Sequence, residues 1–271
     1  MLKRLLLGCT LLFSSLALQA NSFPVTINGN SAETTITLPG GYEVDVALTF
    51  ENVMGLTAQN LNITAYLADP LSANMLNRLP NNFITLQTAF PLVVRIEPLT
   101  DSGFSFSGPL TIDLHTHNLQ YSVNTPLRLY KSHAGAAFED ITIATGAGSI
   151  RAKGQMGNLS DFIIVADLRP MALVANDKAQ KLDGLLNSFS NQISPELLAP
   201  LQNKVSDILV LVQAGNYKLA LAQSKQFQQL ISAASAEQMP DVWRSARDVD
   251  NVSGMLSAAN ATLAYSLRLS L

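Results

Sequence analysis

The sequence predicts an α+β protein, in which an N-terminal antiparallel β-sandwich (residues 21–169) precedes a C-terminal helical bundle (residues 170–271). Between residues 23 and 167, apolar residues alternate with polar ones, and Gly, Pro, Asn and Ser separate the alternating runs. This pattern is typical of short antiparallel strands. After residue 170, apolar residues recur every three or four positions, which is the period of an amphipathic helix.

The strand half begins at Phe23, and its clearest strand covers residues 43–50. Val44, Val46, Leu48 and Phe50 share one face of this strand, and Glu43, Asp45 and Thr49 share the other. Similar alternation predicts further strands around residues 25–27, 35–38, 61–67, 83–86, 92–96, 104–114, 121–123, 127–129, 141–143, 150–152 and 162–165. Regular short strands at this spacing favour a sandwich of two sheets. A short helix is expected within residues 72–79.

The helical half is organised around a hairpin of two helices within residues 194–234. Ser194 is a suitable N-cap, Pro195 suits the first helical position, and Glu196 favours the positive end of the helix dipole. Gly215 is placed to end the first helix in a left-handed conformation, and Asn216 can cap the second. Because the link is this short, we expect the helices to be antiparallel neighbours.

The flanking segments are expected to supply the remaining helices. Residues 172–175 are read as a linker, followed by a helix through residues 178–192 with Asp177 as its cap. Beyond Pro240, a short helix is expected to hold Val242 and Trp243. Residues 252–271 fit either a helix or a strand inserted in an outer membrane, and the two preceding helices favour a helix.

Two stretches resemble known bacterial modules. The first stretch comprises Leu201 to Lys204, the Gly215-Asn216-Tyr217 turn and the expected helix from Ala220 to Ile231. Its pattern is similar to that of a small helical domain called FIMAH-like, which is found in extracellular bacterial proteins. Residues 127–166, with the phrase Leu159-Ser160-Asp161-Phe162, resemble the end of immunoglobulin-like sandwiches in bacterial surface proteins. The first resemblance implies an accessory or interaction module, and the second implies a β-sandwich in a secreted bacterial protein. Neither implies an activity.

The N-terminus predicts export from the cytoplasm. Lys3 and Arg4 precede an apolar run from Leu5 to Leu18, and Ala20 offers a small residue at which a signal peptide is cleaved. Cleavage near Ala20 would remove Cys9, the only cysteine, so the mature chain would form no disulfide. We therefore expect a periplasmic or secreted protein.

Charge and hydropathy narrow the set of partners. The chain has 17 basic and 20 acidic residues, and its basic residues are not clustered, so nucleic acid is not an expected partner. No apolar stretch after the signal peptide is long enough to span a membrane. The expected partner is an envelope protein or a glycan.

The three histidines form the main candidate site. His115 and His117, with Asp113, fall on one face of the predicted strand because side chains alternate along it. His133 lies just past the next strand but one, and Glu139 and Asp140 are near enough to complete or orient the set. A His-x-His pair with a third histidine or a carboxylate is what zinc requires. Such a site predicts a metal-dependent hydrolase or lyase, provided that the three imidazoles converge.

The other motifs are weaker. Asp248, Asp250 and Asn251 contain oxygen ligands that calcium prefers, but the glycine and distal glutamate of an EF-hand loop are missing. The chain contains no Gly-x-Ser-x-Gly sequence. No cofactor is expected. The leading hypothesis is a non-catalytic binding or structural module of the bacterial cell envelope, and the zinc enzyme is the alternative.

Overall fold

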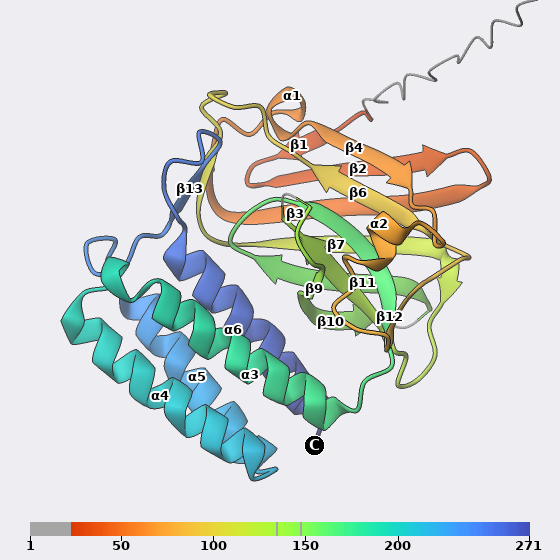
Figure 1. Ribbon diagram of the computed structural model, residues 1–271. Coiled ribbons are helices and arrows are strands. Elements are labelled where there is room, and N and C mark those ends of the chain that lie inside the picture. Colours follow the sequence, from red (N-terminus) through yellow and green to blue (C-terminus); the bar gives the residue numbers. More distant parts are fainter. Residues whose placement is uncertain (1–22, 134, 147) are drawn as a thin grey trace, which may run out of the picture.

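The computed structural model describes residues 23–133, 135–146 and 148–271 (Figure 1). The predicted signal peptide lies outside these residues. In the described part, the strands form two antiparallel sheets, and helices follow them, so the predicted α+β class is confirmed.

The first sheet, called sheet A, contains seven of the described strands. Its order is β1-β2-β3-β7-β11-β10, and β13 pairs with β7 beside β11. The strands are β1 (Thr26–Asn28), β2 (Ser31–Leu38), β3 (Tyr42–Met54), β7 (Ser105–Gln120), β10 (Thr142–Gly146), β11 (Ser149–Met156) and β13 (Val242–Arg244).

The second sheet, called sheet B, contains six of the described strands. Its order is β4-β6-β12-β8-β9, and β5 also pairs with β12. The strands are β4 (Ile63–Leu67), β5 (Ile84–Leu86), β6 (Leu92–Ile96), β8 (Leu127–Ser132), β9 (Glu139–Asp140) and β12 (Asp161–Asp167). The inward faces of sheets A and B share one hydrophobic core, which makes the pair a sandwich.

The two sheets differ on their outer faces. Every residue of β12 is buried, because the segment from Ala68 to Leu86, with Tyr130 and Phe138, forms a second core cluster over sheet B. On sheet A, β2 and β3 keep the alternation that the sequence predicts, with buried residues alternating with half-buried or exposed ones. Sheet A therefore leaves part of its outer face open to solvent.

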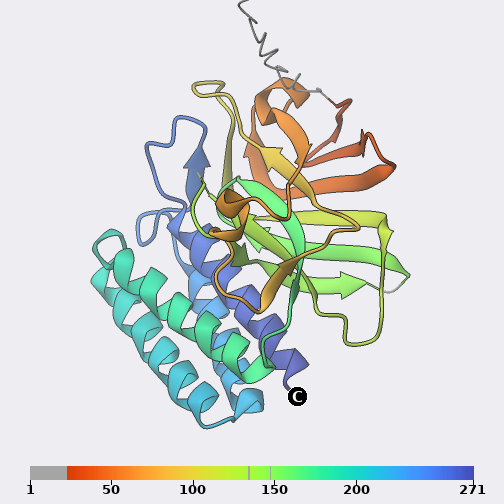
Figure 2. The same ribbon diagram turned by 45° about the vertical axis from the view of Figure 1, so that its right-hand side comes forward.

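The long helices form a bundle in which α3 and α6 lie toward the sandwich and α4 and α5 lie away from it (Figures 1 and 2). The helices are α1 (Ala58–Leu61), α2 (Ala73–Leu76), α3 (Met171–Ser188), α4 (Pro195–Gln213), α5 (Tyr217–Ala233) and α6 (Val252–Leu269), with a short 3₁₀ turn at Ser190–Gln192. No helix in the described part of the chain combines the length and apolar character needed to cross a membrane.

The predicted hairpin is confirmed as α4 and α5. Gly215 has a φ of 71°. Its N–H donates to the carbonyl oxygen of Val212, and the N–H of Asn216 donates to the carbonyl oxygen of Leu211. These are the two hydrogen bonds of a Schellman motif. Ser194 and Asn216 occupy the N-cap positions, although neither side chain makes a capping hydrogen bond.

Four local predictions are wrong. Residues 121–123 form no strand, because β7 ends at Gln120 and a turn follows it. Asp177 caps no helix, because it lies inside α3, whose N-cap is Pro170. Residues 172–175 belong to α3 and are not a linker, because Val174 and Ala175 are buried. Val242 and Trp243 form strand β13 and not a helix, because this segment pairs with β7. By contrast, residues 252–269 are helical as expected, and α2 lies within the predicted short helix.

Strand β13 brings the segment between α5 and α6 back into the sandwich. Trp243 pairs with Phe106 of β7, and their rings stack with centroids 5.4 Å apart. The Trp243 ring also meets Phe104 at 6.0 Å, and the residue is only 6% exposed. The helical half therefore contributes a large side chain to the core of the strand half.

Helix α6 lies against sheet A at unusually short range. A Cβ built on Gly157, which follows β11, would lie 2.5 Å from the backbone nitrogen of Met255. The side chain of Asn251 caps α6 by accepting from Gly254, and its amide donates to the carbonyl oxygens of Gly108 and Gly157. This contact fixes the first turn of α6 on the sheet.

We predict that Trp243→Ala lowers the free energy of unfolding by about 3–5 kcal/mol, since it leaves a large cavity among aromatic rings. The matched control is Val242→Ala, which should cost less than about 1 kcal/mol because Val242 is partly exposed. Urea unfolding followed by circular dichroism measures both. Equal stability of the two variants would contradict the core role of Trp243.

We also predict that Gly157→Ala lowers the free energy of unfolding by about 1–3 kcal/mol, because the added methyl group meets backbone atoms of α6. Gly184→Ala is the control: it lies exposed in α3 with nothing near its Cβ position, and should stabilise the protein by about 0.5–1 kcal/mol. Calorimetric unfolding distinguishes these opposite signs.

Candidate functional site

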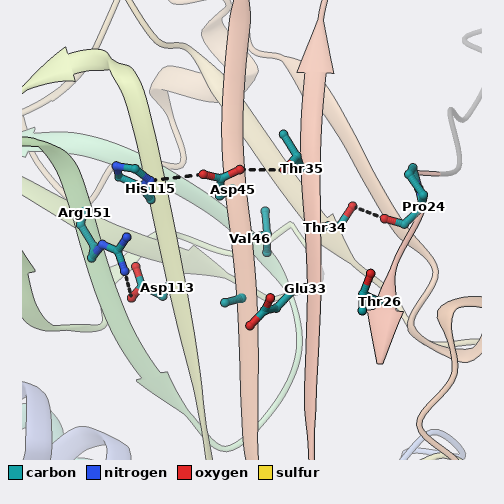
Figure 3. Close-up of a pocket in the computed structure, with 11 residues that line it drawn as sticks. Pro24, Thr26, Glu33, Thr34, Thr35, Asp45, Val46, Asp113, His115 and Arg151 are labelled. Atoms are coloured by element: carbon teal, nitrogen blue, oxygen red, sulfur yellow. Dashed lines mark hydrogen bonds and ion pairs between the residues drawn. The ribbon is translucent and has the colours of Figure 1, made fainter. Parts of the chain in front are cut away.

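The open face of sheet A contains a polar hollow of about 530 Å³, called the sheet A hollow (Figure 3). Strands β1, β2, β3, β7 and β11, with Pro24, supply its lining, and no helix residue lines it. Its residues are Pro24, Thr26, Glu33, Thr34, Thr35, Asp45, Val46, Ala47, Asp113, His115 and Arg151.

The strand register places the polar residues of the hollow in two rows across the sheet. In the first row, Thr35 pairs with Asp45, and Asp45 pairs with His115, which in turn pairs with Arg151. Side chains in such rows lie close enough to interact directly. This row therefore brings together residues that are up to 116 positions apart in the chain.

The second row explains why the surface is hollowed. Here Glu33 pairs with Ala47, Ala47 pairs with Asp113, and Asp113 pairs with Lys153. The small side chain of Ala47 lies between two acidic residues on the neighbouring strands. Because Ala47 fills little space, the carboxyl groups of Glu33 and Asp113 border an open floor.

Asp45 and His115 are held in fixed positions within the first row. Thr35 Oγ1 donates to Asp45 Oδ1 over 2.7 Å, and His115 Nδ1 lies 3.2 Å from Asp45 Oδ2. The other ring nitrogen of His115 lies 2.6 Å from Ser149 Oγ. The hydrogen bond from Thr35 holds the pKa of Asp45 below its ordinary value, with a smaller contribution from His115, and partial burial opposes the shift.

Asp113 is the residue of the hollow whose hydrogen bonds are incomplete. Its side chain is 13% exposed, and its Oδ2 atom lies 3.6 Å from Arg151 and 3.7 Å from Lys153. Its Oδ1 atom is buried and has no hydrogen-bond partner among the described residues. At 3.6 and 3.7 Å, Arg151 and Lys153 are too far from Oδ2 to donate a hydrogen bond. A ligand that brings a hydroxyl donor to Oδ2 would therefore add a hydrogen bond to a charged group.

The structure separates the three histidines of the predicted zinc site. His115 and His117 are neighbours on β7, as expected, with ring centroids 4.8 Å apart. His133 follows β8 in sheet B, where its Nδ1 atom lies 3.3 Å from the carbonyl oxygen of Leu159. Among the described residues, no group of three or more His, Cys, Asp or Glu side chains is arranged to hold a metal ion.

The acidic residues considered as further ligands also have other partners. Asp140 lies 2.6 Å from Lys178, and Glu139 pairs with Lys131 and Lys181, all at the junction of sandwich and helices. In the loop weighed for calcium, Asp248 pairs with Arg244, Asp250 accepts from Gln192, and Asn251 caps α6.

A model of a family of unknown function, DUF6689, matches residues 7–270. The chain belongs to this family. No curated protein and no solved structure matches the chain. Membership in DUF6689 assigns no activity to the sheet A hollow, so its role must be argued from its chemistry.

Sequence reasoning identified only part of this site. It placed Asp113, His115 and His117 on one solvent-facing strand face, and it assigned Asp45 to the polar face of its own strand. It missed that Glu33, Thr35 and Arg151 lie beside them. The alternation in each strand predicts the face, but the register between distant strands is a tertiary property.

We predict that Thr35→Val raises the pKa of Asp45 toward its ordinary value, because the variant lacks the main hydrogen-bond donor to this carboxylate. A folded-state pKa below the unfolded one stabilises the fold above the unfolded pKa, and this contribution disappears as the pH falls through the folded pKa. The variant should therefore lose the stability that the lowered pKa of Asp45 contributes above its unfolded-state pKa. Carbon-13 NMR titration of the Asp45 carboxyl group measures the shift. Thr37→Val, on the same face of β2, should leave it unchanged.

Proposed function

We propose that the protein is a non-catalytic binding module of the bacterial cell envelope and that the sheet A hollow binds a glycan. Export by a signal peptide at residues 1–20 would place it in the periplasm or outside the cell. The observation that carries the proposal is the Asp113 carboxylate, which lines an open, polar hollow and whose Oδ2 atom makes only long ion pairs with Arg151 and Lys153.

The chemistry of the hollow suits a ligand rich in hydroxyl groups. Glu33, Asp45 and Asp113 supply carboxylate acceptors, Arg151 supplies donors, and threonine hydroxyl groups can do both. A sugar hydroxyl group can donate to Asp113 Oδ2 and accept from a neighbouring donor. The lining contains no Phe, Trp or Tyr side chain, so we expect recognition to depend mainly on hydrogen bonds.

One feature argues against the metal-dependent enzyme. A zinc-dependent hydrolase or lyase needs a free imidazole nitrogen from each ligand, whereas both nitrogens of His115 already have partners and His133 lies on the other sheet. We therefore do not propose the metal-dependent enzyme.

We predict that Ala47→Leu abolishes glycan binding, because its side chain fills the floor between Glu33 and Asp113. Asp113→Ala should weaken binding about tenfold or more, the effect of losing a hydrogen bond to a charged group. An array of bacterial envelope glycans identifies the ligand, and calorimetric titration of residues 21–271 measures its affinity.

The matched control is Thr49→Leu, which adds apolar volume to the same face of β3 outside the hollow. It should bind like the unchanged protein. Equal binding by the Ala47→Leu and Thr49→Leu variants would show that the glycan binds elsewhere. Failure of the unchanged protein to bind any glycan on the array would refute the proposed function itself.

A further inference from the structure

A second group of polar residues lies at the junction between sandwich and helices. It shares no lining residue with the sheet A hollow. Lys131 lies on β8 and Glu139 directly opposite it on β9. Asn158 lies in the connection between β11 and β12. These three residues line the same cavity of about 250 Å³, which α3 and α6 also border.

The amine of Lys131 is in contact with the side-chain amide of Asn158. Lys131 Nζ donates to Asn158 Oδ1 over 2.6 Å, and it lies 3.3 Å from Glu139 Oε1. Since a carbonyl bond is about 1.2 Å long, Nζ lies within about 3.8 Å of the amide carbon, Cγ. This upper limit lies just above the separation of about 3–3.5 Å between reacting atoms in a near-attack arrangement.

The surroundings favour the nucleophilic form of this lysine. The Lys131 side chain is only 7% exposed, and burial lowers its pKa, although Glu139 opposes the shift. A neutral amine is a nucleophile, whereas an ammonium ion is not. Glu139 is positioned to accept the proton, and its second oxygen, Oε2, contacts Lys181 of α3.

We propose that Lys131 and Asn158 join in an intramolecular amide bond, with Glu139 transferring the protons. Glu139 takes a proton from the Lys131 ammonium group, and the freed electron pair on Nζ forms a bond to Asn158 Cγ. The carboxyl group of Glu139 then protonates the amide nitrogen of Asn158, whose bond to Cγ breaks, and ammonia leaves. The surplus proton on the new amide nitrogen passes through Glu139 to ammonia, so the reaction needs no external reagent.

Other lysines of the chain provide internal comparisons. Lys178 is as deeply buried and also has a lowered pKa, but it faces the Asp140 carboxylate and the backbone oxygen of Thr262. A carboxylate is a poor electrophile for an amine. Lys204 donates to the side-chain amide of Gln223 over 3.0 Å, but no carboxylate pairs with it among the described residues. Only Lys131, within the described chain, combines burial, an amide and a carboxylate.

The bond would act as a covalent clamp on the surface that supports the helices. It would connect β8 to the connection that precedes β12, and the closed loop would contain β9, β10 and β11. The loop also contains Asp140 and Glu139, which contact α3, and Gly157, which accepts from the α6 cap residue Asn251. The clamp is independent of whether the sheet A hollow binds a glycan.

We predict that the purified, folded protein is lighter by one ammonia than its sequence requires, as measured by mass spectrometry under denaturing conditions. Tryptic digestion should yield a branched peptide in which Lys131 is joined to Asn158, with no cleavage after Lys131. The peptides of Lys204 and Gln223 should be linear. These linear peptides serve as the control for non-specific cross-linking.

Three variants test the roles of the residues. Glu139→Gln keeps both reacting groups but removes the proton carrier, so it should have the full mass. Lys131→Arg, which keeps the positive charge beside Glu139, and Asn158→Ala should also have the full mass. Circular dichroism establishes that each variant is folded.

Either of two results from the unchanged protein would overturn the proposal. The first is the full mass with linear peptides at Lys131 and Asn158. The second is the loss of ammonia with both peptides still linear, which would indicate a succinimide at Asn158. Loss of ammonia with the branched peptide in the Glu139→Gln variant would remove Glu139 from the mechanism.

Discussion

The close contact between the first turn of α6 and the backbone of sheet A determines how the two halves fit together. Asn251 caps the helix and donates to the carbonyl oxygens of Gly108 and Gly157. The missing side chain of Gly157 lets the helix backbone approach the sheet. Because this turn is fixed, the preceding segment is held beside β7, where Trp243 enters the core. Helix α6 then provides the surface on which α3 and α5 pack.

Charged residues form a second connection, between sheet B and α3. Arg169, between β12 and α3, donates to Asp167, Asp177 and the hydroxyl group of Tyr130. Burial alone would raise the pKa of Asp167, but the hydrogen bonds from Arg169 and Tyr130 outweigh it and lower the pKa. A buried pair contributes little net stability, whereas removing one partner is costly. These pairs therefore specify how the helices dock more than they stabilise the docked state.

The sequence predicted the features that depend on local pattern. Alternation along residues 43–50 gave the correct faces of β3, and Gly215 gave the correct end of α4. The sequence did not predict the features of the fold that depend on contacts between distant residues. Residues 242–244 are too short to show a period, and they form a strand because β7 offers a free edge and Phe106 a stacking partner. The sequence predicts a linker at residues 172–175, but these residues belong to α3. The burial of Val174 results from the packing of the whole bundle, which a local pattern does not show. The sheet A hollow required the register of β3 on β7, which pairs residues 70 positions apart.

The two outer faces of the sandwich have different uses because the helices and loops cover only some of the strands. Sheet B is covered, so its polar groups at the junction are buried against α3, where desolvation makes a lysine amine reactive toward an adjacent amide. Part of sheet A stays open, so its polar groups remain hydrated, and the small side chain of Ala47 leaves a hollow beside Asp113. The same residue types therefore favour different chemistry on the two sheets. Burial at the junction favours an internal bond that completes the fold, and partial exposure on sheet A favours a ligand from outside.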